Sequence, residues 1–203
     1  MKKQNNEKPI IAVGIVLFVF GIAAMSYALL SKDDPQVVST TNTVTSSNSK
    51  DVALPVDNSN ATDKASTESQ LLYLIEEEKL AHDVYTVMYQ KYGARVFGNI
   101  LKSEETHQGR VLTLLQARNI TDPRSEELGV FKNQELQTLY NQLIEQGNKS
   151  EVEAYKVGVI IEEKDIADIS AQLATATEQD VISTLEDLRR GSESHLRAFN
   201  RRL

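Results

Sequence analysis

The stretch Glu104-Glu105-Thr106-His107 lies inside an apolar helical pattern, and a related stretch, Ser192-Glu193-Ser194-His195, lies inside another one near the end of the chain. In an α-helix, residues three apart lie about 60° apart around the axis. Glu104 and His107 therefore point the same way, into whatever their helix packs against. Helical bundles that bind two metal ions build such a Glu-x-x-His half-site twice. The first half-site is complete here, whereas Ser192 occupies the Glu position of the second.

The composition favours one helical domain with extensions. The chain has 203 residues, and 40% of them are hydrophobic, which is enough to fill a core. Glycine (9) and proline (4) are scarce, so few helix breakers interrupt the later part of the chain. The net charge of −7 argues against a nucleic-acid partner, because nucleic-acid-binding domains carry a basic footprint. The absence of cysteine excludes disulfides, thiol catalysis and cysteine-zinc sites.

Residues 10–30 predict a transmembrane helix. The segment contains no charged residue, and a helix of this length spans about 30 Å, the thickness of a bilayer core. Lysines in residues 1–9 place that flank in the cytoplasm and the rest of the chain outside the cell membrane. A cleaved signal peptide has the same charge order, but its apolar region usually runs only about 7–15 residues. The length favours a single-pass anchor, and cleavage would instead give a secreted protein.

Residues 31–66 predict a disordered tether between this anchor and the domain of residues 67–203. The stretch is rich in Ser, Thr and Asn and has no helical period. Such a sequence cannot bury enough apolar area to offset the entropy that ordering would cost. We therefore expect a flexible linker.

Beyond the tether, the apolar spacing predicts four long helices and no strand. The first two cover residues 67–92 and about 95–118, and a long connection with a short helix over residues 133–146 follows. The third long helix opens with a capping box at Ser150, and the fourth begins near residue 177. Gly191, inside the fourth helix, either costs about 1 kcal/mol against Ala or marks close packing. The predicted fold class is all-α: a ferritin-like four-helix bundle with a short extra helix in the crossover between helices two and three, preceded by the transmembrane helix.

Five polar residues fall on the inward faces of these helices, and they are the predicted metal ligands: Glu78, Glu104, His107, Glu162 and His195. A buried carboxylate is costly unless it is paired or binds a metal. Mixed oxygen and nitrogen ligands suit iron, manganese or zinc, and nothing indicates an organic cofactor. A full di-iron site of this type uses four Glu and two His. A single metal, an asymmetric pair and a vestigial site therefore all stay open.

Other polar residues have weaker or different interpretations. Asp165, on the flank of its helix, could swing into the site, and His82, one turn after Glu78, could also contribute. The adjacent acids are expected to be solvated or to orient metal-bound histidines: Glu105, Glu163 and Glu193. Glu76 and Glu77 are expected largely to the sides of the apolar stripe of the first helix. Tyr85 and Tyr155 are expected in the core, where one near an iron would be a candidate for redox activity. The alternative to a metal is a buried polar network with cations supplied by arginines: Arg110, Arg189, Arg190 and Arg197.

Several separate motifs occur in a characteristic order. They are Glu76-Glu77-Glu78-Lys79-Leu80-Ala81, Ser103-Glu104-Glu105-Thr106-His107, Gly129-Val130-Phe131, Ile161-Glu162-Glu163, and Gly191-Ser192 with His195-Leu196-Arg197-Ala198-Phe199. In these motifs the chain from about Leu71 to Leu203 resembles the DUF2202 family of ferritin-like domains. The family has no firmly assigned activity, so the resemblance implies the fold and not a reaction.

Two functions are consistent with these features. The first is a membrane-tethered, extracytoplasmic ferritin-like protein that binds iron or a similar metal through inward Glu and His residues, with or without redox activity. The second is a non-catalytic helical interaction module of the cell envelope with a vestigial polar core. Contact with a membrane is expected through residues 10–30, and the sequence leaves a homodimer open. It does not decide whether the protein is an enzyme.

Overall fold

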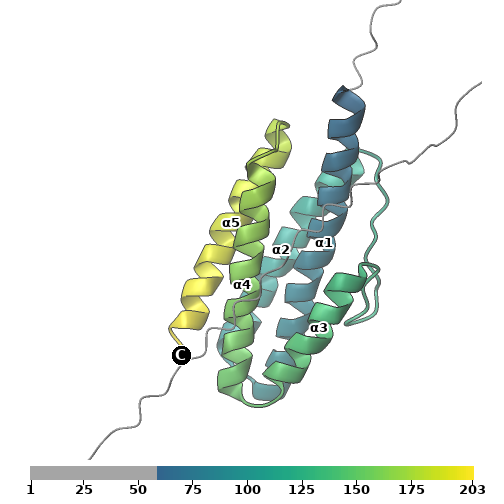
Figure 1. The fold of residues 1–203 in the computed structure, drawn as a ribbon. Helices are drawn as coiled ribbons and strands as arrows, with labels where there is room; N and C mark the ends of the chain where they lie inside the picture. The colour runs from purple at the N-terminus through teal and green to yellow at the C-terminus, as the bar shows by residue number, and fades with distance from the viewer. Residues whose placement is uncertain (1–58) are drawn as a thin grey trace, which may run out of the picture. The chain divides into compact units, whose positions relative to one another are not determined.

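The computed structural model describes residues 59–203, with side chains from residue 66 onward, and this part forms five α-helices and no strand (Figure 1). The long helices are paired into two hairpins, α1 (Ser59–Tyr92) with α2 (Arg95–Ala117) and α4 (Glu151–Leu173) with α5 (Gln179–Asn200). The short helix α3 (Gln134–Gly147) lies in the crossover between the hairpins. The all-α prediction, including the position of the short helix, is confirmed.

The four long helices pack as a square. Helix α1 lies beside α2 and α4, and α5 lies beside α2 and α4, whereas the backbones of the diagonal pairs do not approach closely in the part of the chain described. Helix α3 packs against α1 and α4 from outside this square. Because α1 has neighbours on three sides, every residue from Leu74 to Tyr85 except His82 is buried. Glu76 and Glu77, which the sequence places to the sides of the apolar stripe, are therefore buried as well.

Local sequence signals set most of the helix ends. Gly93 adopts a φ of 65°, a left-handed conformation that glycine accommodates easily, and so ends α1. The hydroxyl of Ser150 accepts the N–H of Glu153 at 3.1 Å and caps α4 as expected. Helix α1, however, begins at Ser59, so residues 59–66 of the predicted tether are helical. Adding turns to an existing helix is cheap once the packed part from Leu71 has formed, because nucleation carries the main cost.

The anchor predicted for residues 10–30 lies outside the described residues, as does most of the predicted tether. Between residues 59 and 203, no helix combines the length and the apolar character that crossing a membrane requires. The transmembrane prediction thus stays a prediction.

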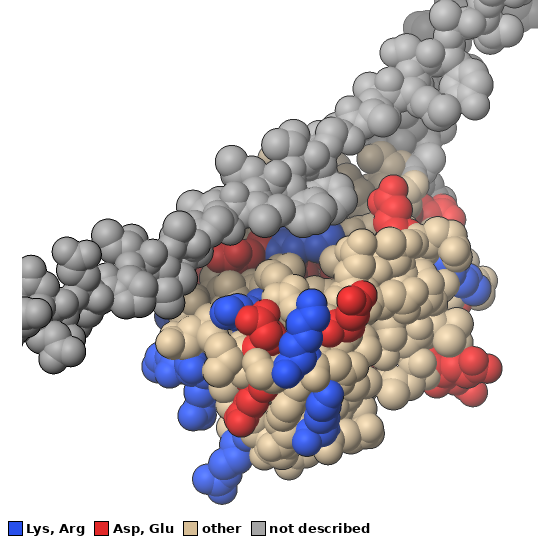
Figure 2. All heavy atoms as spheres, turned by 60° about the horizontal axis from the view of Figure 1, so that its bottom comes forward, with Lys and Arg blue, Asp and Glu red and all other residues tan. Residues whose placement is uncertain are grey.

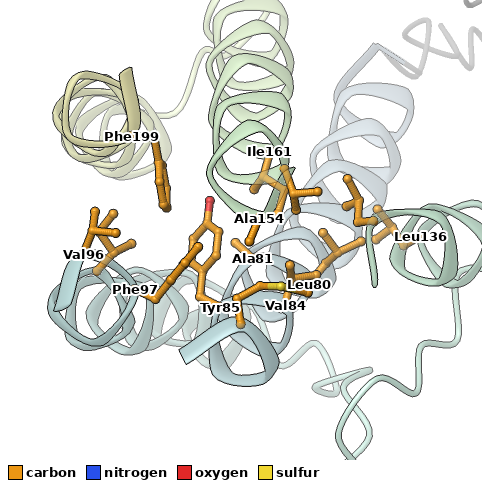
Figure 3. Packing of buried hydrophobic residues seen from close by; sticks show 14 of the residues in the cluster. Leu80, Ala81, Val84, Tyr85, Val96, Phe97, Leu136, Ala154, Ile161 and Phe199 are labelled. Carbon is orange, nitrogen blue, oxygen red and sulfur yellow. The ribbon is translucent and has the colours of Figure 1, made fainter. Parts of the chain in front are cut away.

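Two apolar layers fill the bundle on either side of a polar one. One layer contains Tyr85, Phe97 and Phe199, whose rings contact one another with centroids 5.3–5.9 Å apart (Figure 3). The other layer contains leucines from three helices, among them Leu74, Leu115 and Leu185. Along α1 and α2 the inward polar residues fall between the stretches that enter these two layers. The polar layer is therefore sealed from water at both ends.

Buried polar side chains of α1 hold the crossover in place. Asp83 accepts the N–H of Gly129 at 2.8 Å and pairs with Lys79, which also donates to the carbonyl of Glu127 at 3.0 Å. Burial opposes ionisation of Asp83, but hydrogen bonds from His82, Lys79 and Gly129 outweigh it and lower the pKa of this carboxyl. The long connection is thus tied to the bundle by charge-assisted hydrogen bonds.

Charged residues of both signs are interspersed on the end of the bundle that Figure 2 turns towards the viewer. Lysine and arginine side chains alternate there with aspartate and glutamate, and no continuous basic stripe crosses this face. A duplex-binding face would instead gather its cations along one groove or helix.

Glu76 provides a test of how the crossover is held. Its two carboxylate oxygens accept the backbone N–H groups of Lys132 at 2.7 Å and Asn133 at 3.0 Å, where α3 is about to begin. In Glu76→Gln, one oxygen becomes an NH₂ that faces an N–H, so the free energy of unfolding should fall by about 1–3 kcal/mol. Urea unfolding of the full chain, followed by circular dichroism, measures this loss. The exposed Glu68→Gln should change it by less than about 0.5 kcal/mol, and equal stability of both variants would contradict the anchoring role.

Candidate metal centre

The polar layer of the bundle receives side chains from all four long helices. Glu78 comes from α1, Glu104 and His107 from α2, Glu162 from α4 and His195 from α5. All five are buried, with exposed fractions between 2% and 7%. The structure therefore brings together every residue that the sequence predicted as a metal ligand.

These residues form two groups that share Glu104. In the first group, Glu78, Glu104 and His107 each offer one ligand atom, and these atoms all lie within 4.8 Å of one another. Glu104, Glu162 and His195 form the second group by the same measure. Oε2 of Glu104 lies 3.3 Å from Nδ1 of His107, and Oε1 lies 2.9 Å from Nδ1 of His195. Each oxygen of Glu104 thus faces the histidine of a different group.

Both imidazoles present the same nitrogen to the carboxylates. Nδ1 of His107 lies 3.2 Å from Oε2 of Glu78, and Nδ1 of His195 lies 3.5 Å from Oε1 of Glu162. The other nitrogen of His107, Nε2, contacts the hydroxyl of Ser103 at 3.4 Å. A polar partner on the far nitrogen is what fixes the ring of a metal-binding histidine. Nδ1 is therefore the nitrogen of each ring that faces the carboxylates.

Several atoms of this layer are buried without a hydrogen bond: Oε1 of Glu78, Oε1 of Glu104 and Nδ1 of His195. The last two are only 2.9 Å apart, yet they are not aligned for a hydrogen bond with each other. An unpaired buried polar atom costs about 1–3 kcal/mol, so native proteins rarely keep one without a reason. Atoms that are close together but not aimed at each other leave room for a shared third partner, and a cation is the partner that carboxylates and an imidazole have in common.

The site binds protons strongly when it holds no metal. Burial raises the pKa of Glu78 to about 8 and that of Glu162 to about 7. Burial also disfavours charge on the histidines, but the facing carboxylates outweigh it and raise the pKa of His107 to about 11 and of His195 to about 9. Burial likewise opposes ionisation of Glu104, yet His107 and His195 lower its pKa to about 2. A metal would have to displace these imidazole protons, and its binding would release them.

The alternative of an arginine-based network does not form between residues 66 and 203. Arg110 and Arg190 both pair with Asp187, Arg189 lies 4.0 Å from Glu193, and Arg197 is exposed. The nearby lysines also form ion pairs with residues outside the five, since Lys164 pairs with Glu77 at 2.6 Å and Lys79 pairs with Asp83. The cationic partners of the five site residues in the described ion pairs are thus the two histidines alone.

The remaining candidates lie elsewhere. His82 is half-buried and contacts Asp83 at 3.4 Å, outside both groups. The acids beside the site residues do not orient the histidines, because Glu105 and Glu163 are exposed and Glu193 faces Arg189. Ser103, which the sequence did not single out, occupies that position beside His107.

The two tyrosines differ in their surroundings. Tyr85 is fully buried, as predicted, and its hydroxyl donates to Oε1 of Glu162 at 2.6 Å. Tyr155, also predicted in the core, is half-buried and packs against its edge, where its ring stacks on Phe97 with centroids 5.7 Å apart and its hydroxyl donates to Glu151. Only Tyr85 therefore touches the site.

Two further residues shape the site. Asp165 is buried, not on the flank of α4 as predicted, and it accepts a hydrogen bond from Ser192. Its signal in the sequence was the spacing of three from Glu162, which puts both on adjoining faces of one helix. Gly191 lies against His107, and a Cβ there would come closer than 3.0 Å to Nε2 of that ring. The close-packing interpretation of Gly191 is therefore confirmed.

Comparisons with known proteins agree with this architecture. The family model described as "Uncharacterized protein domain (DUF2202)" matches residues 67–203. The chain belongs to the DUF2202 family. The uncharacterized protein MJ0754 of Methanocaldococcus jannaschii is 45% identical over 134 residues, which cover 66% of this chain and 72% of that protein. The crystal structure of hypothetical protein MJ0754 superposes with a TM-score of 0.67 at 43% identity, over 68% of this chain and 79% of that one.

Gly191→Ala tests whether the close packing of His107 against Gly191 contributes to stability. The added methyl group must displace the imidazole or spread α2 from α5, so the free energy of unfolding should fall by about 1–3 kcal/mol. Gly109→Ala is the matched control, because a Cβ at Gly109 meets nothing within 4 Å. That change should leave stability equal or raise it by about 0.5–1 kcal/mol through helix propensity. Thermal and urea unfolding of the full chain measure both, and equal effects of the two substitutions would contradict the packing argument.

Proposed function

We propose that this DUF2202 protein is a ferritin-like bundle that binds two divalent metal ions, one at each acid–histidine group, with Glu104 shared between them. The observation that carries the proposal is the set of buried, unpartnered carboxylate and imidazole atoms that converge from four helices. Such a set is stabilised by a cation that replaces the missing hydrogen bonds.

The donor set favours iron or manganese. Each group offers two carboxylates and one imidazole, and such oxygen-rich sites with one nitrogen suit these ions, with zinc as a further candidate. Iron with an open coordination position would supply redox chemistry at this layer. The chain's own residues prepare the site for the metal. The Tyr85 hydroxyl orients Glu162, Ser103 contacts the far nitrogen of His107, and the apolar layers exclude bulk water.

Substitutions in one group should weaken the binding of one ion and leave the other ion bound. In the full chain, purified in detergent without chelators and reloaded with Fe(II) or Mn(II) under anaerobic conditions, we expect two ions per chain. His107→Ala should weaken the ion of the first group by about 10-fold or more, and His195→Ala that of the second, because each ring belongs to one group. Glu104→Gln should weaken both. Elemental analysis and calorimetric titration measure the stoichiometry and the affinities.

The exposed Glu105→Gln, next to the shared carboxylate, is the matched control and should bind two ions like the wild type. Metal should also raise the melting temperature, because an ion at 100 times its Kd stabilises the folded state by about 2.7 kcal/mol. Protein that carries no iron, manganese or zinc, and whose melting point these ions leave unchanged, would contradict the proposal. The non-catalytic interaction module would then be the better account.

We further propose that residues 10–30 anchor the chain in the cell membrane and that the bundle faces outward. Support comes from the uncharged length of the segment and the lysines that precede it. Protease added to intact protoplasts should then remove the bundle and leave the N-terminal segment with the membrane. A tagged cytoplasmic protein serves as the control for lysis, and a bundle that resists the protease until the membrane is broken would overturn this orientation.

A further inference from the structure

The second half-site has a serine where the first has a glutamate, and the serine is already in use. Ser192 is one turn before His195 on α5, as Glu104 is before His107 on α2, and it is 1% exposed. Its hydroxyl donates to Oδ2 of Asp165 on α4 and lies 3.1 Å from the carbonyl of Leu188. The position that lacks a carboxylate on α5 is therefore in direct contact with a carboxylate from the neighbouring helix.

Asp165 is buried without a charge partner. It is 7% exposed, and its Oδ1 is buried and has no hydrogen bond. The other buried acids outside the two groups have charged or backbone partners, although Oε2 of Glu77 has no hydrogen bond. Glu77 pairs with Lys164 and Asp83 with Lys79, and Glu76 accepts the backbone N–H groups of Lys132 and Asn133. Of the buried acids in residues 66–203, Asp165 alone contacts neither a cation nor a backbone N–H. An acid in that position is expensive to keep.

The negative charges that act on Asp165 include members of both groups. Its pKa is raised well above the ordinary value, first by burial and then by the negative charges of Glu78 and Glu162. Glu78 belongs to the first group and Glu162 to the second.

We propose that Asp165, which Ser192 holds when no metal is bound, supplies the fourth carboxylate of the metal centre in place of the glutamate that α5 lacks. This inference rests on the proposed two-metal function and adds a ligand to it. Asp165 lies outside the two groups whose atoms approach within 4.8 Å, so its side chain turns from Ser192 towards the ions when they bind. Aspartate has only two side-chain torsions, and a change of rotamer is within the ordinary range of side-chain motion.

Charge balance supports a fourth carboxylate. Two divalent ions bring four positive charges into a sealed layer, and histidines that bind metal are neutral. The three glutamates of the two groups offset only three of these charges. With Asp165 the layer is neutral, which avoids the cost of a net charge in an apolar core.

The test compares Asp165→Asn with Glu163→Gln in the full chain, titrated with Mn(II). Asparagine has the shape of aspartate but lacks its charge. We therefore expect the affinity for Mn(II) to fall by about 10-fold or more, and the more weakly bound of the two ions to be lost first. Glu163 is exposed on the same helix, and its substitution should change nothing. The double variant Asp165→Asn/Ser192→Glu moves the carboxylate from α4 to α5 and should restore two ions, which a purely structural role of Asp165 would not allow.

The outcomes separate the two proposals. A wild type that binds no metal overturns both. A wild type that binds two ions, with Asp165→Asn indistinguishable from it, overturns the role of Asp165 and leaves the two-metal function standing. The metal-free melting temperature of Asp165→Asn shows whether the variant folds. Should it not fold, Asp165→Ala takes its place with the same expected loss of the second ion.

Discussion

Glu104 lies at the centre of the bundle, with an imidazole beside each of its oxygens and an apolar layer on either side. An ionised carboxylate in such a place is tolerated only where positive charge faces it. One of these imidazoles belongs to its own helix, while the other comes from α5 in the opposite hairpin. Glu104 therefore couples the register of the two hairpins. Sliding α5 by one residue along α2 would separate His195 from Oε1 of Glu104 and leave His107 alone to face this buried carboxylate.

The helices could be predicted where the signal is local. Gly93 and Ser150 set helix ends through their own conformation and hydrogen bonding, and both of these helix ends were predicted from the sequence. The start of α1 was not, because its extension back to Ser59 depends on a nucleus that forms further along the chain. The burial of Glu76 and Glu77 could not be foreseen from α1 alone. It depends on the crossover and on α4, which cover two further faces of the helix.

The candidate site was predictable to the extent that helical spacing decides which side chains face inward. Glu104 and His107, three apart, had to share a face of their helix. The apolar spacing of the last helix likewise placed His195 on its inward face. The choice between Asp165 and its neighbour Ile166 was different, because a small rotation of α4 decides which of them is buried. That rotation is set by tertiary contact: Gly158 lets α4 approach Phe199 so closely that a Cβ there would overlap the ring. Asp165 consequently faces inward while Ile166 is half-buried.

The two groups differ in how far along the chain their members are spread. Glu78, Glu104 and His107 come from one hairpin of consecutive helices, whereas Glu162 and His195 lie in the last two helices. Contacts that are local in sequence form early, and chains fold from the N-terminus as they are synthesised. The first group would thus be complete in a nascent chain that has exposed only α1 and α2. One oxygen of Glu104 would already contact His107 at that moment. The other would gain His195 only after the C-terminal hairpin had folded, so the centre would be assembled in a fixed order.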